Sequence, residues 1–281
     1  MEPYAEMAGI PIGDHYPVRL IGIINVSPES FFKGSVFSSR DDIRRVAEQM
    51  AASGADMLDV GARGTAPYLQ TDISVEEEMD RLVQAIQTTR EVTDIPISAD
   101  TQTASVAQAA LKVGASILND VSGLAHDPEM ATIATGYKGV LLMANASVTS
   151  AQGDPVAVVK GALEAALQRA TQAGIAPERI VLDPGIGFFR NRAISWDEWD
   201  RIILHQLPAF RSFERPLLLS VSRKSVIGKV LGYPDPADRL FGSLGLTALA
   251  VYQGAHLIRT HDIAATRDAV RIAEWLREPV P

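Results

Sequence analysis

The 281-residue sequence contains no cysteine, which excludes disulfides, a thiolate nucleophile and zinc sites built from thiolates. Its five histidines show no metal-binding cluster, and no Ser–His–Asp set occurs at convincing spacing. We find neither a G-x-G-x-x-G motif nor a P-loop. No apolar run reaches the roughly 20 residues that a membrane helix needs.

An excess of basic residues is also lacking, because the formal net charge is −8. This balance argues against nucleic acid or an anionic membrane as a partner. The start of the chain carries Glu2 and Glu6 without a basic region followed by an apolar stretch, so we expect no signal peptide. We therefore expect a cytoplasmic protein, and its 47% hydrophobic content suffices for one large core.

Short apolar segments alternate with amphipathic ones along the chain. Eight strands alternating with eight helices predict a (β/α)8 TIM barrel in residues 18–281, preceded by a surface arm in residues 1–17. A doubly wound open sheet is the alternative, although it would normally carry a glycine-rich turn after its first strand. We expect strands at 18–26, 55–60, 95–99, 116–118, 139–143, 179–182, 216–221 and 256–258. We expect helices at 41–53, after an N-cap at Ser74, and at 104–113, 128–134, 155–173, 196–205, 238–253 and 263–276.

The segment 180–187 is the clearest of these strand ends. Its apolar residues are typical of a strand buried on both faces, and the strand stops at Asp183. Pro184 and Gly185 then predict a turn. A carboxylate at such a position is poorly solvated and needs hydrogen-bond donors from the protein or from a ligand. A turn-forming or helix-capping aspartate is the alternative interpretation.

Polar or soft side chains end nearly every predicted strand, and in a barrel these ends face one mouth. Any one of them has a simpler explanation as a cap, a turn residue or a solvated charge. Together they indicate a site. The residues are Asn25, Asp59, Asp100, Asn119, Met143, Asp183, Lys224, Arg259 and His261.

This set favours a flat, nitrogen-rich heterocycle as the ligand. Asp100, Asn119 and Asp183 can meet the donor edge of such a ring, with Met143 packed against its face. Lys224 can meet a ring carbonyl or ring nitrogen. On the first and last strands, which are neighbours in a closed barrel, Asn25, Arg259 and His261 predict an anion site.

The chain resembles the dihydropteroate synthase family of pterin-binding barrels over about residues 19–277. The motifs are Ile24-Asn-Val-Ser-Pro-Glu-Ser-Phe31, Ser98-Ala-Asp-Thr101, Asn119-Asp-Val-Ser-Gly123, Asp183-Pro-Gly-Ile-Gly-Phe188, Ser222-Arg-Lys-Ser225 and Arg259-Thr-His261. The resemblance implies that p-aminobenzoate displaces pyrophosphate from a dihydropterin pyrophosphate. It implies pterin binding by Asp100, Asn119, Met143, Asp183 and Lys224, and pyrophosphate binding with Mg²⁺ by Asn25, Arg259 and His261. Lys224, Arg259, His261 and Asn25 are then the catalytic residues, with Asn25 as the metal ligand, and we expect a homodimer.

Two loops depart from the family pattern. Lys33 replaces an acid in the first loop. In the second loop Arg63 replaces a glutamate and Ala66 replaces an arginine, while Thr65 is kept. We assign acceptor binding to Thr65, Ser225, Lys33 and Arg63, and the acceptor is p-aminobenzoate or a derivative of it. Two alternatives remain: a methyltransferase of the same barrel family that acts on a corrinoid protein, and a pterin-binding protein without catalysis.

Overall fold

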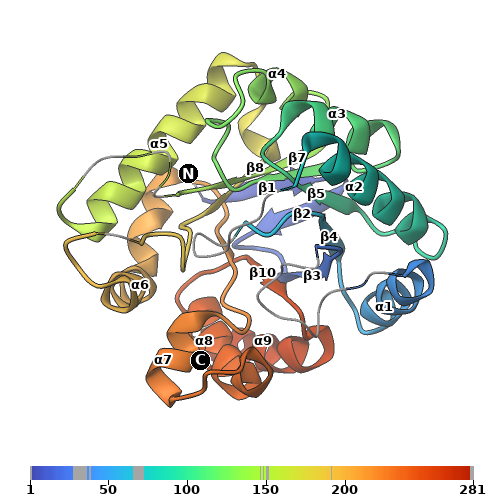
Figure 1. Ribbon diagram of the computed structural model, residues 1–281. Coiled ribbons are helices and arrows are strands. Elements are labelled where there is room, and N and C mark those ends of the chain that lie inside the picture. Colours follow the sequence, from blue (N-terminus) through green and yellow to red (C-terminus); the bar gives the residue numbers. More distant parts are fainter. Residues whose placement is uncertain are drawn as a thin grey trace.

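The computed structural model describes residues 2–27, 37, 39–65, 73–145, 147, 149, 152–190 and 192–278. A barrel of eight parallel strands occupies its centre, and the helices surround the strands (Figure 1). The barrel strands are β3 (Arg19–Asn25), β4 (Met57–Gly61), β5 (Ile97–Asp100), β6 (Ile117–Asp120), β7 (Gly139–Met143), β8 (Ile180–Asp183), β9 (Leu218–Leu219) and β10 (Leu257–Thr260).

The barrel is closed. Its strands pair in the order β8-β7-β6-β5-β4-β3-β10-β9, and a parallel bridge from Leu182 to Leu217 joins the two ends of this series. Closure confirms the predicted (β/α)8 TIM barrel and excludes the open doubly wound sheet. It also brings the first and last barrel strands into register, with Ile21 opposite Arg259.

The predicted helices are found in the predicted order, with ends shifted by one or two residues in most cases, whereas α7 (Ser225–Leu231) was not predicted. Ser74 caps its helix as predicted, because its hydroxyl accepts a hydrogen bond from the Glu77 amide. Within the described ranges, every helix is too short or too polar to span a lipid bilayer. The helices are α1 (Arg40–Ala52), α2 (Val75–Arg90), α3 (Ala104–Lys112), α4 (Met130–Ala134), α5 (Pro155–Gln172), α6 (Trp196–His205), α7 (Ser225–Leu231), α8 (Leu240–Tyr252) and α9 (Ile263–Arg277).

The expectation of a surface arm at the start of the chain is wrong. This segment forms a hairpin of β1 (Tyr4–Met7) and β2 (Ile10–Gly13), in which the side chains of Ala5, Met7 and Ile12 are fully buried. Ala5, Met7 and Ile12 pack against inward-facing residues of seven barrel strands. The hairpin therefore fills the end of the barrel that lies opposite the predicted site.

A polar contact fixes this hairpin region to the barrel. Asp14 forms two hydrogen bonds with Arg211, at 3.0 and 2.6 Å, and lies 3.0 Å from Nε2 of His256. The Leu217 amide donates to Nδ1 of His256. The histidine is thus a neutral Nε2–H tautomer that donates to Asp14, in keeping with burial, which lowers its pKa.

Candidate active site

The predicted ring ligands lie at matching levels of neighbouring strands. Asp100 on β5 is the register partner of Asn119 on β6, and Met143 on β7 is the partner of Asp183 on β8. All four are buried. The barrel thus brings together the two acids, the amide and the thioether that the sequence predicted for one cavity.

A chain of charged contacts spans the mouth from β10 to β6. Arg259 donates from Nε to Asp59 at 2.6 Å and from Nη2 to Asp100 at 3.0 Å. Asn119 donates from Nδ2 to the same Asp59 oxygen at 3.0 Å. The sequence placed Asp59 on the rim without a role, and the structure shows it orienting two ligand candidates. Arg259, predicted for the anion site, also belongs to the ring site.

Two carboxylate oxygens of this cluster, one on Asp59 and one on Asp100, are buried without a hydrogen-bond partner among the described residues. Oδ1 of Asp100 is buried and has no hydrogen-bond partner in the part of the chain that the structure describes. Burial and the nearby Asp59 charge raise the pKa of Asp100 to about 8, against the opposing effect of Arg259. A ligand that brings N–H donors to this oxygen would satisfy it and favour its charged form.

Asp183 is held by the turn that follows it. Its Oδ1 accepts a hydrogen bond from the Gly185 amide at 2.8 Å. Gly185 has a φ of +74°, and a Cβ there would lie 1.9 Å from the Ala144 carbonyl oxygen, so the turn needs glycine. Burial raises the pKa of Asp183, while the charge of Lys224 lowers it. The predicted turn is confirmed, and the carboxylate faces a lysine.

Lys224 comes from the loop between β9 and α7. Its Nζ donates to the Ile186 carbonyl oxygen and lies 4.7 Å from the centre of the Phe188 ring. Burial lowers the pKa of this amine to about 8, and the charge of Asp183 partly restores it. Lys224 therefore lies against the loop that follows β8, a contact that the sequence did not predict.

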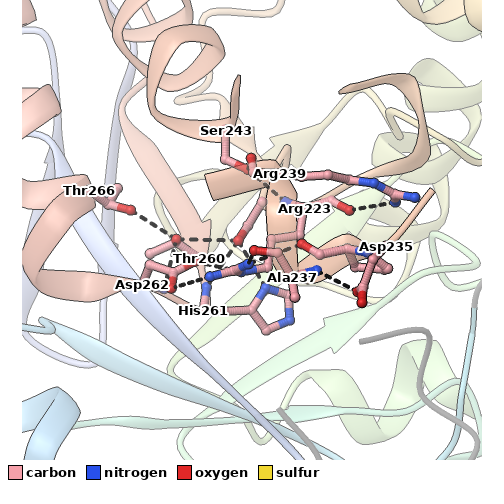
Figure 2. A network of polar contacts seen from close by, with 11 residues as sticks. Arg223, Asp235, Ala237, Arg239, Ser243, Thr260, His261, Asp262 and Thr266 are labelled. Atoms are coloured by element: carbon pink, nitrogen blue, oxygen red, sulfur yellow. Dashed lines mark hydrogen bonds and ion pairs between the residues drawn. The ribbon is translucent and has the colours of Figure 1, made fainter. Parts of the chain in front are cut away.

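His261 lies beside Lys224's loop and is supported from behind. Its Nδ1 is 2.9 Å from the Ser222 hydroxyl. Figure 2 shows the network next to it, in which Arg223 binds both carboxylate oxygens of Asp262 and the Arg239 guanidinium donates to the Arg223 carbonyl. Burial and the surrounding cations lower the pKa of His261 well below its usual range. The imidazole is therefore neutral near pH 7.

The acceptor residues are only partly brought together. Thr65 is half-buried in the loop after β4. Arg63 lies 3.6 Å from the buried Glu78 carboxylate, which also accepts a 2.6 Å hydrogen bond from Thr101. Arg63 is thus charge-paired with the protein, a contact that the sequence did not predict. Lys33 and Ala66 lie outside the described residues.

Ser225 has a neighbour that the sequence analysis missed. Arg190 donates to the Ser225 hydroxyl at 2.7 Å, and its guanidinium stacks 4.0 Å from the Trp196 ring centre. Its place two residues after the Gly-Ile-Gly-Phe turn is the only signal in the sequence. Asn25, at the end of β3, is half-buried, and its backbone carbonyl accepts a hydrogen bond from the Phe37 backbone amide.

Comparisons with known proteins identify the family of the chain and agree with its fold. Residues 21–261 match the family model described as pterin binding enzyme. A dihydropteroate synthase from Synechocystis is 36% identical over 92% of this chain and 89% of its own length. A dihydropteroate synthase structure from Xanthomonas albilineans with 4-aminobenzoic acid superposes with a TM-score of 0.87 at 32% identity and covers all of both chains. One from Clostridium difficile, determined in the presence of pteroic acid, gives 0.84 at 34% identity over 94% and 98%.

Proposed function

Because the chain belongs to the pterin binding enzyme family, we propose that it is a dihydropteroate synthase. It condenses 6-hydroxymethyl-7,8-dihydropterin pyrophosphate with p-aminobenzoate, or a derivative of it, and releases pyrophosphate. The observation that carries the proposal is the buried Asp100 oxygen without a partner, in register with Asn119 and close to Arg259. A pterin edge supplies the N–H donors that this oxygen needs.

Each ring contact follows from the hydrogen-bond capacity of the side chain. Asp100 and Asp183 accept from ring N–H and amino groups. Asn119 donates one amide N–H to Asp59, and its carbonyl oxygen can accept from the ring. Lys224 donates to a ring acceptor, and Met143 packs on the ring face. The set is deep in the barrel, so the pyrophosphate and the acceptor lie nearer the opening.

The reaction needs positioning and charge compensation. The bond between the pterin methylene and the pyrophosphate oxygen breaks, and its electron pair leaves with the pyrophosphate. The acceptor amine forms the new C–N bond and loses one proton. Arg259 and the neutral N–H of His261 stabilise the leaving group, and Asn25 orients it.

The donor set fits a magnesium ion that is held mainly by the substrate. Across the described residues, no group of three acidic or histidine side chains is placed to hold a metal on its own. Mg²⁺ commonly uses one or two protein oxygens together with phosphates and water. The Asn25 carboxamide would supply the protein oxygen, and the bound ion would neutralise the pyrophosphate charge.

The two alternative functions are less well supported. A corrinoid methyltransferase gives no use to an anion site that contains Arg259 and His261. A binding protein without catalysis would not need a lysine, an arginine and a histidine around one opening. The similar proteins named above are synthases, and one was determined with 4-aminobenzoic acid.

We further propose a homodimer formed through α8 and α9, which lie side by side (Figure 1). Phe241, Leu249 and Tyr252 share one face of α8 by their helical spacing, and all three are exposed, Phe241 at 83%. Ile272 and Trp275 form a similar exposed face on α9. Aromatic surface of this extent is typical of subunit contacts. Sedimentation velocity should show a dimer that Phe241→Glu dissociates; a monomeric parent protein would contradict it.

A cytoplasmic location stays a prediction.

The decisive test measures pyrophosphate release. The purified protein is mixed with the dihydropterin pyrophosphate and Mg²⁺, with and without p-aminobenzoate, and both pyrophosphate and the condensed pterin are quantified. We expect the two products in equal amounts and only in the presence of an acceptor. Release without condensation, or no release with any aminobenzene acceptor, would contradict the proposal.

A further inference from the structure

One peptide group links a buried acid on α6 to the site lysine. The Gly187 N–H donates to Oδ1 of Asp200 at 2.8 Å. The carbonyl of the same peptide group, on Ile186, accepts a hydrogen bond from Nζ of Lys224. The N–H and C=O of a trans peptide point in opposite directions, so Asp200 and Lys224 lie on opposite sides of this group.

The direction of the peptide dipole suits both charges. The carboxylate lies at the positive N–H end, and the ammonium lies at the negative C=O end. Hydrogen bonds in such a chain polarise one another in a low-dielectric interior. A negative charge on Asp200 therefore strengthens the carbonyl of Ile186 as an acceptor for Lys224.

Gly187 allows this close arrangement. Its φ of +84° is unfavourable for other residues, and a Cβ there would lie 3.3 Å from Cδ and 3.6 Å from Nζ of Lys224. The backbone thus packs directly against the lysine side chain. The contact is part of the turn after β8 that also orients Asp183, so one loop positions both Asp183 and Lys224.

Asp200 is not accounted for by packing alone. The residue is 1% exposed, and its Oδ2 has no hydrogen-bond partner within the described chain. A buried acid with one unsatisfied oxygen costs stability, and a neutral residue would avoid that cost. Burial raises the pKa of Asp200 to about 6, while the Gly187 amide, Lys224 and Arg190 oppose this change. Asp200 is therefore ionised at neutral pH.

We propose that Asp200 is a positioning residue that holds Lys224, through the Ile186–Gly187 peptide, in place and in its charged form for the pterin. Four charged groups face the lysine: Asp183 and Asp200 favour its ammonium form, whereas Arg259 and Arg190 disfavour it. Asp200 in turn faces Lys224, Arg190 and, on its own helix, Asp197. The proposed function assigns Asp183 to the pterin, so Asp200 is the acid that supports Lys224 from outside the site. The part of this inference that concerns catalysis rests on the proposed function.

The test separates charge from geometry with Asp200→Asn, which keeps an acceptor for the Gly187 amide and removes the charge. The six lysines allow ¹³Cε-lysine NMR titration of the intact protein, with Lys224 assigned by its loss in Lys224→Arg. We expect the Lys224 titration to move to lower pH by roughly one unit. Asp197→Asn removes the same charge from the first turn of the same helix and should leave Lys224 unchanged.

The parent protein provides a check that does not depend on a variant. Its Lys224 signal should respond to pH near 6, where Asp200 gains a proton, as well as near 8. No response near pH 6, or an unmoved Lys224 titration in folded Asp200→Asn, would overturn the inference. In kinetic assays the alkaline limb of kcat/KM for the pterin should shift with the NMR titration. An inactive parent protein with the NMR shift present would refute the proposed function and leave the link between Asp200 and Lys224 standing.

Discussion

Arg259, on the last strand of the barrel, donates to a carboxylate oxygen of Asp59 on the second, 2.6 Å away. The Nη2 atom of the same guanidinium donates to Asp100, so one cation faces two buried acids. Arg259 therefore has a structural task before any substrate binds. Its removal would leave Asp59 with Asn119 as its side-chain donor and Asp100 without one among the described residues, and the loss of a cation between two buried acids is costly.

This relationship separates two variants of the anion site. His261→Ala should weaken binding of the pyrophosphate-bearing pterin at least tenfold, about 1.4 kcal/mol, and hardly change binding of the plain hydroxymethyl pterin. Arg259→Ala should weaken the binding of both ligands, because it also disturbs Asp100. The loss of affinity should be larger for the pterin that carries the pyrophosphate. Calorimetry with the two ligands, in the presence of Mg²⁺, measures the difference. Equal losses in both variants would remove the two residues from the anion site.

Asp183→Asn should weaken binding of the dihydropterin more than tenfold, the equivalent of about 1.4 kcal/mol. The variant amide can still accept from Gly185, but its NH2 group then faces the donors of the ring. Calorimetry with the pterin alone is the measurement. A folded Asp183→Asn protein with the affinity of the parent would show that this carboxylate does not contact the ring.

Asp14→Asn should lower stability in a manner that depends on pH. Hydrogen bonds from Arg211 hold the pKa of Asp14 at about 2 in the folded state, below the 3.8 of an unperturbed aspartate. The carboxylate therefore stabilises the fold above about pH 4, and this contribution is lost as the pH falls toward 2. We expect a loss of about 2 kcal/mol at pH 7 from this difference in pKa. Urea unfolding at pH 7 and pH 3 measures it.

Asp41→Asn is the control for this stability test, because Asp41 forms an exposed ion pair with Arg44. Its unfolding midpoint should match that of the parent protein at both pH values. An Asp14→Asn loss that is as large at pH 3 as at pH 7 would mean that packing, not the charge, fixes the hairpin region.

The altered loops predict an acceptor with extra negative charge. If Lys33 and Arg63 recognise it, a phosphorylated ribosyl-aminobenzene should exceed p-aminobenzoate in kcat/KM, and Lys33→Ala and Arg63→Ala should reduce this preference. The Arg63 contact with Glu78 sharpens the design, because Glu78→Gln removes the competing carboxylate and should increase the preference. Sulfonamides should inhibit weakly. A higher kcat/KM for plain p-aminobenzoate, together with unchanged kinetics in both alanine variants, would exclude recognition of extra negative charge by these loops.

The strand ends could be predicted from the sequence because a barrel sends every such end to one mouth. Asp100, Asn119 and Asp183 needed only the correct assignment of three short apolar runs. The hydrogen bond from Arg259 to Asp59 could not be predicted. It forms only when the barrel brings together two strands whose residues lie 200 positions apart in the sequence. The burial of Glu78 with Arg63 likewise depends on how α2 packs under the second loop.

Two other features gave weak signals. The hairpin strand Tyr4–Met7 alternates exposed and buried residues, but four residues are too few for a periodicity to stand out. In the sequence, Asp200 cannot be told apart from the other polar residues of an amphipathic helix. Its hydrogen-bond partner is the backbone amide of Gly187, 13 residues earlier. Contacts of a side chain with a distant backbone leave no pattern in residue types.

The N-terminal hairpin also determines the route that molecules take. Met7 and Ile12 fill the lower end of the barrel, and a Cβ on Gly139 would lie 2.7 Å from Cε of Met7. Substrates, products and displaced water must therefore all use the opposite opening. An acceptor that arrives first would stand between the solvent and the deeper ring-binding residues, so high concentrations of the acceptor should slow the entry of the pterin.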